Sequence, residues 1–259
     1  MENTVTQKIH VVVPAAGKGV RMGAGNIPKA LVPFNGRPIV CHLLDSIDAS
    51  GVCHDPIIVV GHKGEMVKEL LGSRYRYAFQ EEQLGTGHAV RMTKPLLEDD
   101  AQHVLVLYSD HPLVTASTIQ RLVKTHLQSN TVLTMMTTVV DEFTGWKQGF
   151  LYWGRILRDR YQRIIAVVEE KDATDAVRSI RELNPSFFCF RADWLWSHLQ
   201  HLTNKNAQKE YYLTDLVKMA MREGEPITSI QVDPMECLGV NTKEELIMIE
   251  GLSKKGKKI

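Results

Sequence analysis

The sequence has few cysteines, no long apolar run and no excess of charge of either sign. Only 4 of its 259 residues are cysteine, and they are scattered without the spacing of a zinc site or a disulfide framework. We therefore expect reduced thiols and an intracellular, cytoplasmic protein. No apolar stretch approaches the roughly 18 residues that span a bilayer. The first residues also lack the basic-then-apolar pattern of a signal peptide, so we expect no membrane partner.

The near-neutral charge excludes a general binder of nucleic acid. There are 31 Lys and Arg residues against 30 Asp and Glu, which gives a formal charge of +1, whereas nucleic-acid binders carry a marked basic excess. Lysines are concentrated in the last residues, so the remainder is slightly acidic. We expect residues 251–259 to form a Lys-rich tail without regular structure.

The first half of the chain alternates between short apolar runs and helical patterns. The apolar runs predict strands at 9–14, 56–60, 77–80 and 104–108. Helically spaced apolar residues predict helices at 38–47, 64–71 and 86–98, and another after 115. Buried strands that alternate with helices are typical of a parallel sheet covered on both faces. We therefore predict an α/β fold with a Rossmann-like, mostly parallel sheet, whose ligands bind beyond the carboxyl ends of the strands.

The second half is richer in strands. Strand patterns occur at 131–141, 150–157, 163–169, 186–190 and 227–232, and helical patterns at 193–202 and 213–223. Thr242-Lys-Glu-Glu245 is a capping box that predicts the start of a last helix. No linker-like stretch separates the halves. We expect a single domain, with a nucleotide-binding core at about 8–130 and a β-rich lobe, with its return to the core, at about 131–250.

A small-residue loop follows the first strand. Ala15, Ala16, Gly17 and Gly19 allow backbone N–H groups to approach an anion, and Lys18, Arg21 and Lys29 add positive charge. This combination suits a polyphosphate. The spacing is not that of a Walker A motif, which requires Gly-x-x-x-x-Gly-Lys-Ser/Thr. It is not the dinucleotide fingerprint either, because Met22 stands in place of the third glycine. A plain strand-to-helix turn with surface lysines remains the alternative.

Several segments together resemble the sugar-1-phosphate nucleotidylyltransferases over roughly residues 8 to 250. The loop Ala15–Met22 with Pro28-Lys29 resembles the signature loop of that family. The segment Gln83-Leu-Gly-Thr-Gly-His-Ala89 resembles the nucleobase loop of its N-acetylglucosamine-1-phosphate uridylyltransferases. Further matches, in the expected order, are Tyr108-Ser-Asp-His-Pro112, Gly154-Arg-Ile156, Val168–Ala173, Glu182-Leu-Asn184, Asn206–Asp215 and Gly239-Val-Asn241.

The resemblance implies an enzyme with a nucleotide-diphospho-sugar transferase fold and a sugar-binding second lobe. Such an enzyme transfers a nucleoside monophosphate, here UMP from UTP, to a sugar 1-phosphate, here N-acetylglucosamine 1-phosphate, and releases pyrophosphate. The sugar phosphate is already anionic near pH 7, so the reaction needs positioning and charge stabilisation by cations, backbone donors and Mg²⁺.

The candidate residues fall into four groups. Asp110 ends an apolar strand, where a carboxylate has no packing role, and it is the first candidate ligand for Mg²⁺; an Asp that caps a turn would fit as well. The resemblance adds Asn241 as a second metal ligand. It also makes Arg21, Lys29 and Asp110 catalytic, and assigns Ala15, Ala16, Gly17, Lys18, Gly19, Gln80, Gly85 and Thr86 to the nucleotide. The sugar-binding candidates are Tyr108, Gly154, Glu169 and Asn184.

Three departures from the family pattern leave alternatives open. Pro14 is typical of the cytidylyltransferases of isoprenoid synthesis, Ser109 stands for a usual glycine, and Pro185-Ser186 stands for Thr-Gly. A cytidylyltransferase acting on a sugar or polyol phosphate therefore remains an alternative, as does a catalytically silent nucleotide-sugar-binding protein. No hexapeptide repeat follows, so we expect no acetyltransferase activity, and a monomer or small homo-oligomer rather than the family's trimer.

Overall fold

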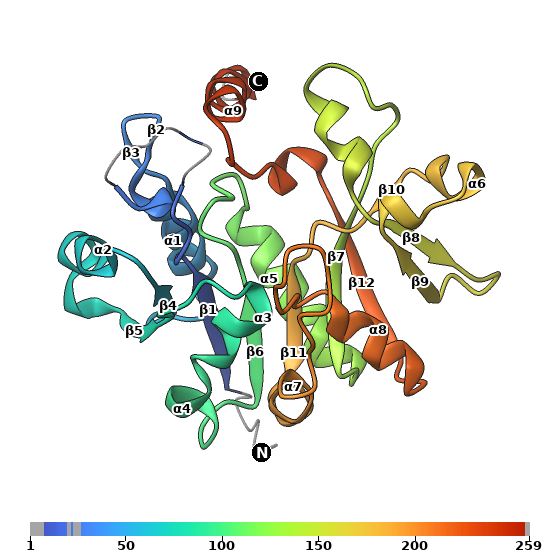
Figure 1. Cartoon of the computed structure of the whole chain (residues 1–259), viewed down its shortest axis with the longest axis horizontal. Helices are drawn as coiled ribbons and strands as arrows, with labels where there is room; N and C mark the ends of the chain where they lie inside the picture. The colour runs from blue at the N-terminus through green and yellow to red at the C-terminus, as the bar shows by residue number, and fades with distance from the viewer. Residues whose placement is uncertain (1–7, 20–21, 23–26, 257–259) are drawn as a thin grey trace, which may run out of the picture.

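The computed structural model describes residues 8–19, 22 and 27–256, and these residues form a ten-stranded sheet with helices around it (Figure 1). The strand order is β5-β4-β1-β6-β11-β7-β10-β8-β9, and β12 pairs with β7. The strands are β1 (Ile9–Pro14), β4 (Ile57–Val60), β5 (Arg76–Phe79), β6 (His103–Val106), β7 (Leu133–Val139), β8 (Arg155–Arg158), β9 (Ile164–Val168), β10 (Glu182–Leu183), β11 (Phe188–Arg191) and β12 (Ile227–Val232). A separate small hairpin joins β2 (Pro33–Phe34) to β3 (Arg37–Pro38).

The central part of the sheet is mostly parallel, as the sequence predicts. Strand β1 pairs in parallel with both β4 and β6, β4 pairs in parallel with β5, and β12 pairs in parallel with β7. Strand β11 is antiparallel to β6 and β7, which it separates. The carboxyl ends of β1, β4 and β6 therefore lie along one edge of the sheet.

Helices cover both faces because the side chains of the central strands alternate between two buried clusters. Val11 and Val13 of β1 pack in one cluster, with α1, α5 and α9, while Val12 packs in the other, with α3, α7 and α8. The helices are α1 (Ile39–Ser50), α2 (Gly64–Leu71), α3 (Thr86–Arg91), α4 (Lys94–Leu97), α5 (Ala116–Ser129), α6 (Asp175–Arg178), α7 (Ala192–Leu199), α8 (Asp215–Arg222) and α9 (Lys243–Gly256). In the part of the chain that the structure describes, no helix is long and apolar enough to cross a membrane.

Three local predictions were wrong. The single helix expected over 86–98 is divided into α3 and α4, since Pro95 has no backbone N–H to donate to the Arg91 carbonyl and lies in the first turn of α4, where proline is tolerated. The first part of the strand expected at 150–157 belongs to a 3₁₀ helix, η4 (Gly145–Tyr152), and the strand β8 starts only at Arg155. The Lys-rich tail was expected to be irregular from residue 251, but α9 continues through Gly256.

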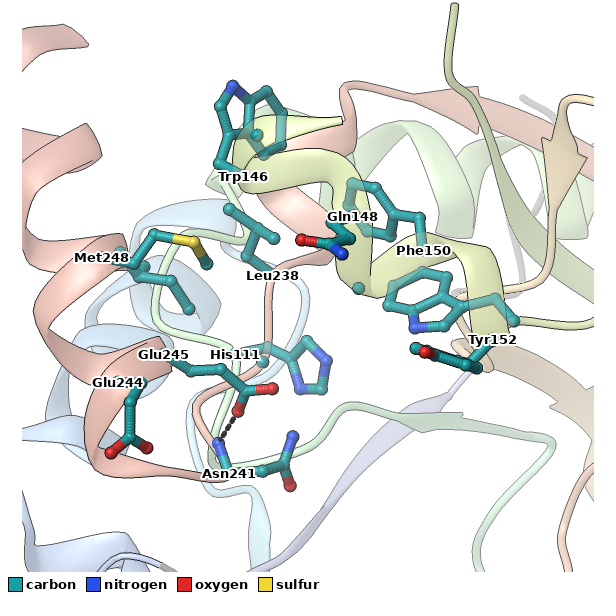
Figure 2. Close-up of a pocket in the computed structure, with 15 residues that line it drawn as sticks. His111, Trp146, Gln148, Phe150, Tyr152, Leu238, Asn241, Glu244, Glu245 and Met248 are labelled. Carbon is teal, nitrogen blue, oxygen red and sulfur yellow. Dashed lines mark hydrogen bonds between the residues drawn. The ribbon is translucent and has the colours of Figure 1, made fainter. Parts of the chain in front are cut away.

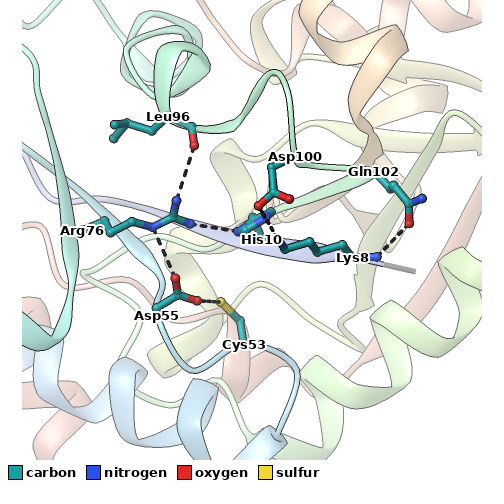
Figure 3. Close-up of polar contacts among 8 residues, drawn as sticks. All are labelled: Lys8, His10, Cys53, Asp55, Arg76, Leu96, Asp100 and Gln102. Carbon is teal, nitrogen blue, oxygen red and sulfur yellow. Dashed lines mark hydrogen bonds and ion pairs between the residues drawn. The ribbon is translucent and has the colours of Figure 1, made fainter. Parts of the chain in front are cut away.

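A polar network closes the amino ends of the parallel strands, at the edge opposite the candidate loops (Figure 3). Arg76 joins two strands here, since its Nη2 lies 3.0 Å from Nδ1 of His10 and its Nε lies 3.3 Å from a carboxylate oxygen of Asp55. Lys8 donates its backbone N–H to Oε1 of Gln102 at 2.8 Å. These contacts connect the segments at the amino ends of the strands. The candidate loops lie at the opposite, carboxyl edge.

The buried His126 of α5, which contacts the half-buried His103 of β6, predicts acid sensitivity. Nε2 of His126 lies 3.0 Å from Nδ1 of His103, and its Nδ1 lies 2.9 Å from the Thr134 hydroxyl. Burial, together with the charges of His103 and Arg191, lowers the pKa of His126 to about 4. An unfolded histidine binds its proton near pH 6.5, so the folded state loses stability as the pH falls from about 6.5 to about 4.

We expect the free energy of unfolding in urea to fall by about 2 kcal/mol across this pH window. His126→Gln should remove most of that pH dependence, whereas His54→Gln, whose side chain is 76% exposed, should keep it. Equal pH dependence in both variants and the parent protein would show that His126 is not its source.

Candidate active site

The loops after β1 and β6 meet at the carboxyl edge of the sheet. The Ala15 N–H donates to the Val59 carbonyl at 2.8 Å, which extends the pairing with β4 past the end of β1. Asp110 follows β6, the other neighbour of β1. The parallel arrangement therefore brings the small-residue loop and the Ser109-Asp110 turn together, as the sequence predicts.

The small residues of the first loop allow Lys29 to fold back on it. The Lys29 N–H donates to the Gly17 carbonyl at 3.2 Å. Gly19 has φ of +65°, and a Cβ there would lie 3.3 Å from the Lys29 Cα. Glycine at this position therefore serves the turn itself. Of the other loop residues, Ala15 and Ala16 are buried and Lys18 is exposed, and Arg21 lies outside the described residues.

The Lys29 ammonium lies between two oxygen donors from distant parts of the chain. It donates to Oδ2 of Asp110, and it donates to Oδ1 of Asn241, 212 residues away in the sequence, at 2.8 Å. Only 15% of the Lys29 side chain and 17% of the Asp110 side chain are exposed. The structure thus brings together three of the predicted residues, with a positive charge held between a carboxylate and an amide oxygen.

His111 holds the second oxygen of Asp110. Its Nδ1 lies 2.8 Å from Asp110 Oδ1. The imidazole packs edge-on against Phe187, with ring centroids 4.8 Å apart, and it fills the space beside Gly239, where a Cβ would lie 2.7 Å from Nε2. Burial disfavours the charged carboxylate, but His111 and Lys29 together hold the pKa of Asp110 well below its usual range. Asp110 is therefore ionised at neutral pH.

A capping box orients Asn241 at the start of α9. Oε2 of Glu245 accepts hydrogen bonds from the backbone N–H groups of Asn241 at 2.6 Å and Thr242 at 3.0 Å, and the Thr242 hydroxyl accepts from the Glu245 N–H at 3.2 Å. The Val240 N–H also donates to the Asp110 carbonyl at 2.9 Å. The helix start predicted from the sequence thus fixes the position of Asn241 relative to Asp110.

The predicted nucleobase loop is held largely by its own polar groups. Gln80 is buried, and its Nε2 lies 3.2 Å from the Gly85 carbonyl and 3.0 Å from Nδ1 of His88. The Thr86 hydroxyl accepts a hydrogen bond from the Leu213 N–H at 3.0 Å. The side chains of Gln80 and Thr86 thus form hydrogen bonds that shape the loop. Their polar character in the sequence fits this internal role as well as contact with a base.

A segment from the second half of the chain clamps the same loop. The Tyr211 N–H donates to the Leu84 carbonyl at 2.7 Å, and the Tyr211 carbonyl accepts from the Gly87 N–H at 2.8 Å. Gly85 has φ of +101°, and a Cβ there would lie 2.7 Å from the Tyr211 carbonyl oxygen. Residue-by-residue reading of the sequence missed Tyr211, whose only signal was its place within the matched segment 206–215.

Three of the sugar-binding candidates are direct neighbours in the second lobe. The Asn184 N–H donates to the Gly154 carbonyl at 3.0 Å, and a Cβ on Gly154 would lie 3.5 Å from Oε1 of Glu169. Asn184 Oδ1 accepts from the Ser186 N–H at 2.9 Å, and Ser186 has φ of +67°. That left-handed backbone explains why a glycine is usual at this position.

Tyr108, the fourth sugar-binding candidate, lies beside Phe187 and contacts Thr86 of the base loop. Its ring packs on Phe187 with centroids 5.8 Å apart and lies 6.0 Å from the His111 ring. Burial raises the pKa of Tyr108, with a further rise from the charge of Asp110, against an opposing hydrogen bond with Thr86. Tyr108 is therefore a neutral phenol at neutral pH.

Comparison with known proteins identifies the family. The sequence model of the MobA-like NTP transferase domain matches residues 11–216. The chain belongs to the MobA-like NTP transferase family. It is therefore a nucleotidyltransferase, as the motifs predict.

Curated relatives are similar to this transferase in sequence, and a solved structure of another protein is similar to it in fold. The chain is 42% identical to the bifunctional protein GlmU of Heliobacterium modesticaldum over 93% of its own length and 51% of that protein. It is 40% identical to GlmU of Brevibacillus brevis over 96% of its length and 52% of that protein. The chain thus spans about half the length of these curated relatives. The apo-UDP-glucose pyrophosphorylase structure, at 16% identity, aligns with a TM-score of 0.77 over 97% of this chain and 99% of that one, which confirms the fold.

A pocket adjoins the candidate site. A pocket of about 560 Å³ lies between η4 and α9, and His111 and Asn241 contribute to its lining (Figure 2). The described residues contain no cluster of three or more His, Cys, Asp or Glu side chains that could hold a metal. Asp110 and Asn241 offer one carboxylate and one amide oxygen at this edge of the sheet, both within reach of the Lys29 ammonium.

Proposed function

We propose that this nucleotidyltransferase transfers UMP from UTP to N-acetylglucosamine 1-phosphate and releases pyrophosphate. The observation that carries the proposal is the convergence of Lys29, Asp110 and Asn241 at the carboxyl edge of the sheet. The identity of about 40% to the GlmU proteins across nearly the whole chain supports it. The proximity of three sugar-binding candidates in the second lobe, Gly154, Glu169 and Asn184, also supports the proposal.

Mg²⁺ fits the donor set of this site. A carboxylate and an amide oxygen are ligands that Mg²⁺ accepts together with waters and phosphate oxygens. The Lys29 ammonium between them marks a place where the protein already stabilises positive charge. We propose that Asp110 and Asn241 hold Mg²⁺, which when bound would neutralise the charge that develops on the transferred phosphate.

The protein's own groups then act by position and charge. Lys29 has a long side chain whose ammonium, released from Asp110, would bind the triphosphate near Gly17 and Gly19. His111 keeps the Asp110 carboxylate ionised and oriented. No general base is needed, because the attacking phosphate oxygen is already anionic near pH 7.

We propose that the second lobe orients the acceptor sugar. The Glu169 carboxylate would accept hydrogen bonds from sugar hydroxyls, and the buried Asn184 and Gly154 would form the wall beside it. Tyr108 would line the cleft between sugar and base. Arg21, Lys18 and the backbone of Ala15 and Ala16 would contribute to phosphate binding.

The choice of uridine rests on the loop from Gln83 to Ala89, whose shape depends on Gln80 and Gly85. The rival cytidylyltransferase hypothesis rests on Pro14. In the structure Pro14 ends β1, and its carbonyl accepts from the Ser109 N–H at 3.3 Å. Any residue at position 14 could accept this backbone hydrogen bond, so the choice between uridine and cytidine rests on the base loop. We also propose a cytoplasmic location, which the four free thiols support, and a monomer or small homo-oligomer.

A pyrophosphate-release panel tests this proposal. Purified protein with Mg²⁺ is incubated with UTP, CTP, GTP, ATP or dTTP, each with several sugar 1-phosphates. We expect release to be fastest with UTP and N-acetylglucosamine 1-phosphate. Turnover with CTP alone would contradict the uridine assignment, and no turnover with any pair would favour a silent nucleotide-sugar-binding protein.

A further inference from the structure

The pocket between η4 and α9 has the size of a ligand site. Its volume of about 560 Å³ lies within the range of small-molecule pockets. Figure 2 shows Trp146 and Phe150 on one side, Met248 on the other, and Leu238 between them. The lining is therefore mainly aromatic and aliphatic, as expected for a site that encloses an apolar body.

The aromatic wall is rigidly supported. Phe150 is fully buried and packs edge-on against Trp146 and Trp153, with ring centroids 6.0 Å and 4.6 Å away. The buried Arg155 donates to the Leu151 carbonyl at 3.0 Å and to the Trp153 carbonyl. These bonds hold the end of η4 against β8, so the pocket does not depend on a ligand to form.

Two carboxylates are among the polar groups of the lining, which also include His111, Gln148 and Asn241. Glu244 and Glu245 line the pocket from the first turn of α9, and none of the lining residues that the structure describes is Lys or Arg. The pKa of Glu244 is lowered by its backbone hydrogen bond and by the Thr242 hydroxyl, so this carboxylate is ionised at neutral pH. Anionic ligands, including nucleotides and sugar phosphates, are disfavoured here.

An ammonium group already lies over one of the pocket's indoles. Lys147 Nζ is 5.6 Å from the ring centroid of Trp146, and it also pairs with Asp141. Indole rings attract cations through the negative charge on their faces. Lys147 does not line the pocket, so the pocket combines an aromatic wall, beside which the protein itself holds a cation, with two carboxylates from α9.

We propose that this pocket binds a small organic cation with an apolar body, and that its occupancy inhibits nucleotidyl transfer. The apolar body would lie between η4 and Met248, and the cation would face Glu244 and Glu245. The inhibition rests on the proposed function, whereas the binding of the cation in the pocket does not.

The link to the transferase site runs through the start of α9. Oε2 of Glu245 accepts the Asn241 N–H at 2.6 Å, and Asn241 Oδ1 lies 2.8 Å from the Lys29 ammonium. A cation that engages Glu245 competes with this hydrogen bond and disturbs Asn241. The effect requires no contact between the ligand and the substrates, so inhibition should be non-competitive with both.

Calorimetric titration of the full chain with three indoles tests the binding. Tryptamine carries a cation, indole is neutral and indole-3-acetate is an anion, while all three share one ring system. We expect tryptamine to bind about tenfold or more tightly than indole-3-acetate, with indole between them. No binding of tryptamine, or equal binding of all three, would overturn the proposal.

Matched variants locate the site. Met248→Lys places an ammonium in the pocket and should abolish tryptamine binding, whereas Ile247→Lys, on the neighbouring position of α9 that is 62% exposed, should not. Trp146→Ala should weaken binding, and Tyr161→Ala, an aromatic 63% exposed elsewhere, should leave it unchanged. Thermal melting verifies that each variant is folded. Equal binding in Met248→Lys and Ile247→Lys would overturn the location.

Enzyme kinetics tests whether binding of the cation inhibits nucleotidyl transfer. Tryptamine should lower kcat without raising KM for UTP or for the sugar phosphate, and Met248→Lys should be insensitive to it. Displacement of bound tryptamine by either substrate alone would place it in the substrate site and overturn the proposal. If no substrate pair is turned over, the proposed function fails while the titrations still decide whether the pocket binds the cation.

Discussion

Replacing Asp110 by Asn is expected to lower kcat for nucleotidyl transfer by about a hundredfold or more, the scale of losing a charged group that stabilises a transition state. The change keeps the volume of the side chain and removes its charge. A neutral amide is a poor ligand for Mg²⁺ and no longer balances the Lys29 ammonium, which donates to Asp110 in the structure. Binding of UTP in the absence of metal should change much less.

Asp159→Asn is the matched control for this prediction. The Asp159 side chain is 18% exposed, against 17% for Asp110, and it accepts backbone hydrogen bonds in a turn of the second lobe. It should retain activity close to that of the parent protein. Activity of Asp110→Asn within tenfold of the parent, with an unchanged melting temperature, would show that Asp110 is not an essential metal ligand.

Replacing Gly85 by Ala is expected to disrupt the predicted nucleobase loop. With φ of +101°, Gly85 has a backbone that L-residues rarely adopt, and a Cβ would lie 2.7 Å from the Tyr211 carbonyl oxygen. The substitution should cost about 2 kcal/mol of unfolding free energy and raise KM for UTP about tenfold or more, because the clamp formed by Tyr211 must open.

Gly149→Ala is the control for the glycine substitution. A Cβ on Gly149 would meet no heavy atom within 4 Å. Urea denaturation and KM for UTP should therefore remain close to those of the parent protein. If Gly85→Ala behaves like Gly149→Ala in both measurements, the close contact with Tyr211 does not hold the loop.

The fold was largely predictable because its core strands are continuous apolar runs. A strand such as 57–60 is buried on both faces, and four consecutive apolar side chains record that burial directly. Where local patterns were ambiguous the prediction failed. Phe150 begins an apolar run, yet it is buried by ring packing against Trp146 and Trp153, which carries no strand periodicity.

The candidate site was predictable in part, for a different reason. Asp110 and the small-residue loop follow parallel strands, so topology alone brings them together. Asn241 lies 212 residues from Lys29, and only the resemblance to a family connects the two. The sequence also cannot reveal which polar groups the protein uses internally, as with Gln80 and Thr86, because their partners come from loop geometry.

The most direct test of the central claim is a competition experiment analysed by mass spectrometry. Purified protein with Mg²⁺ and N-acetylglucosamine 1-phosphate is given equal concentrations of UTP, CTP, dTTP, ATP and GTP, with Asp110→Asn as the inactive control. We predict UDP-N-acetylglucosamine as the main product, absent from the control. A CDP-linked product in its place, or no nucleotide sugar at all, would contradict the proposed function.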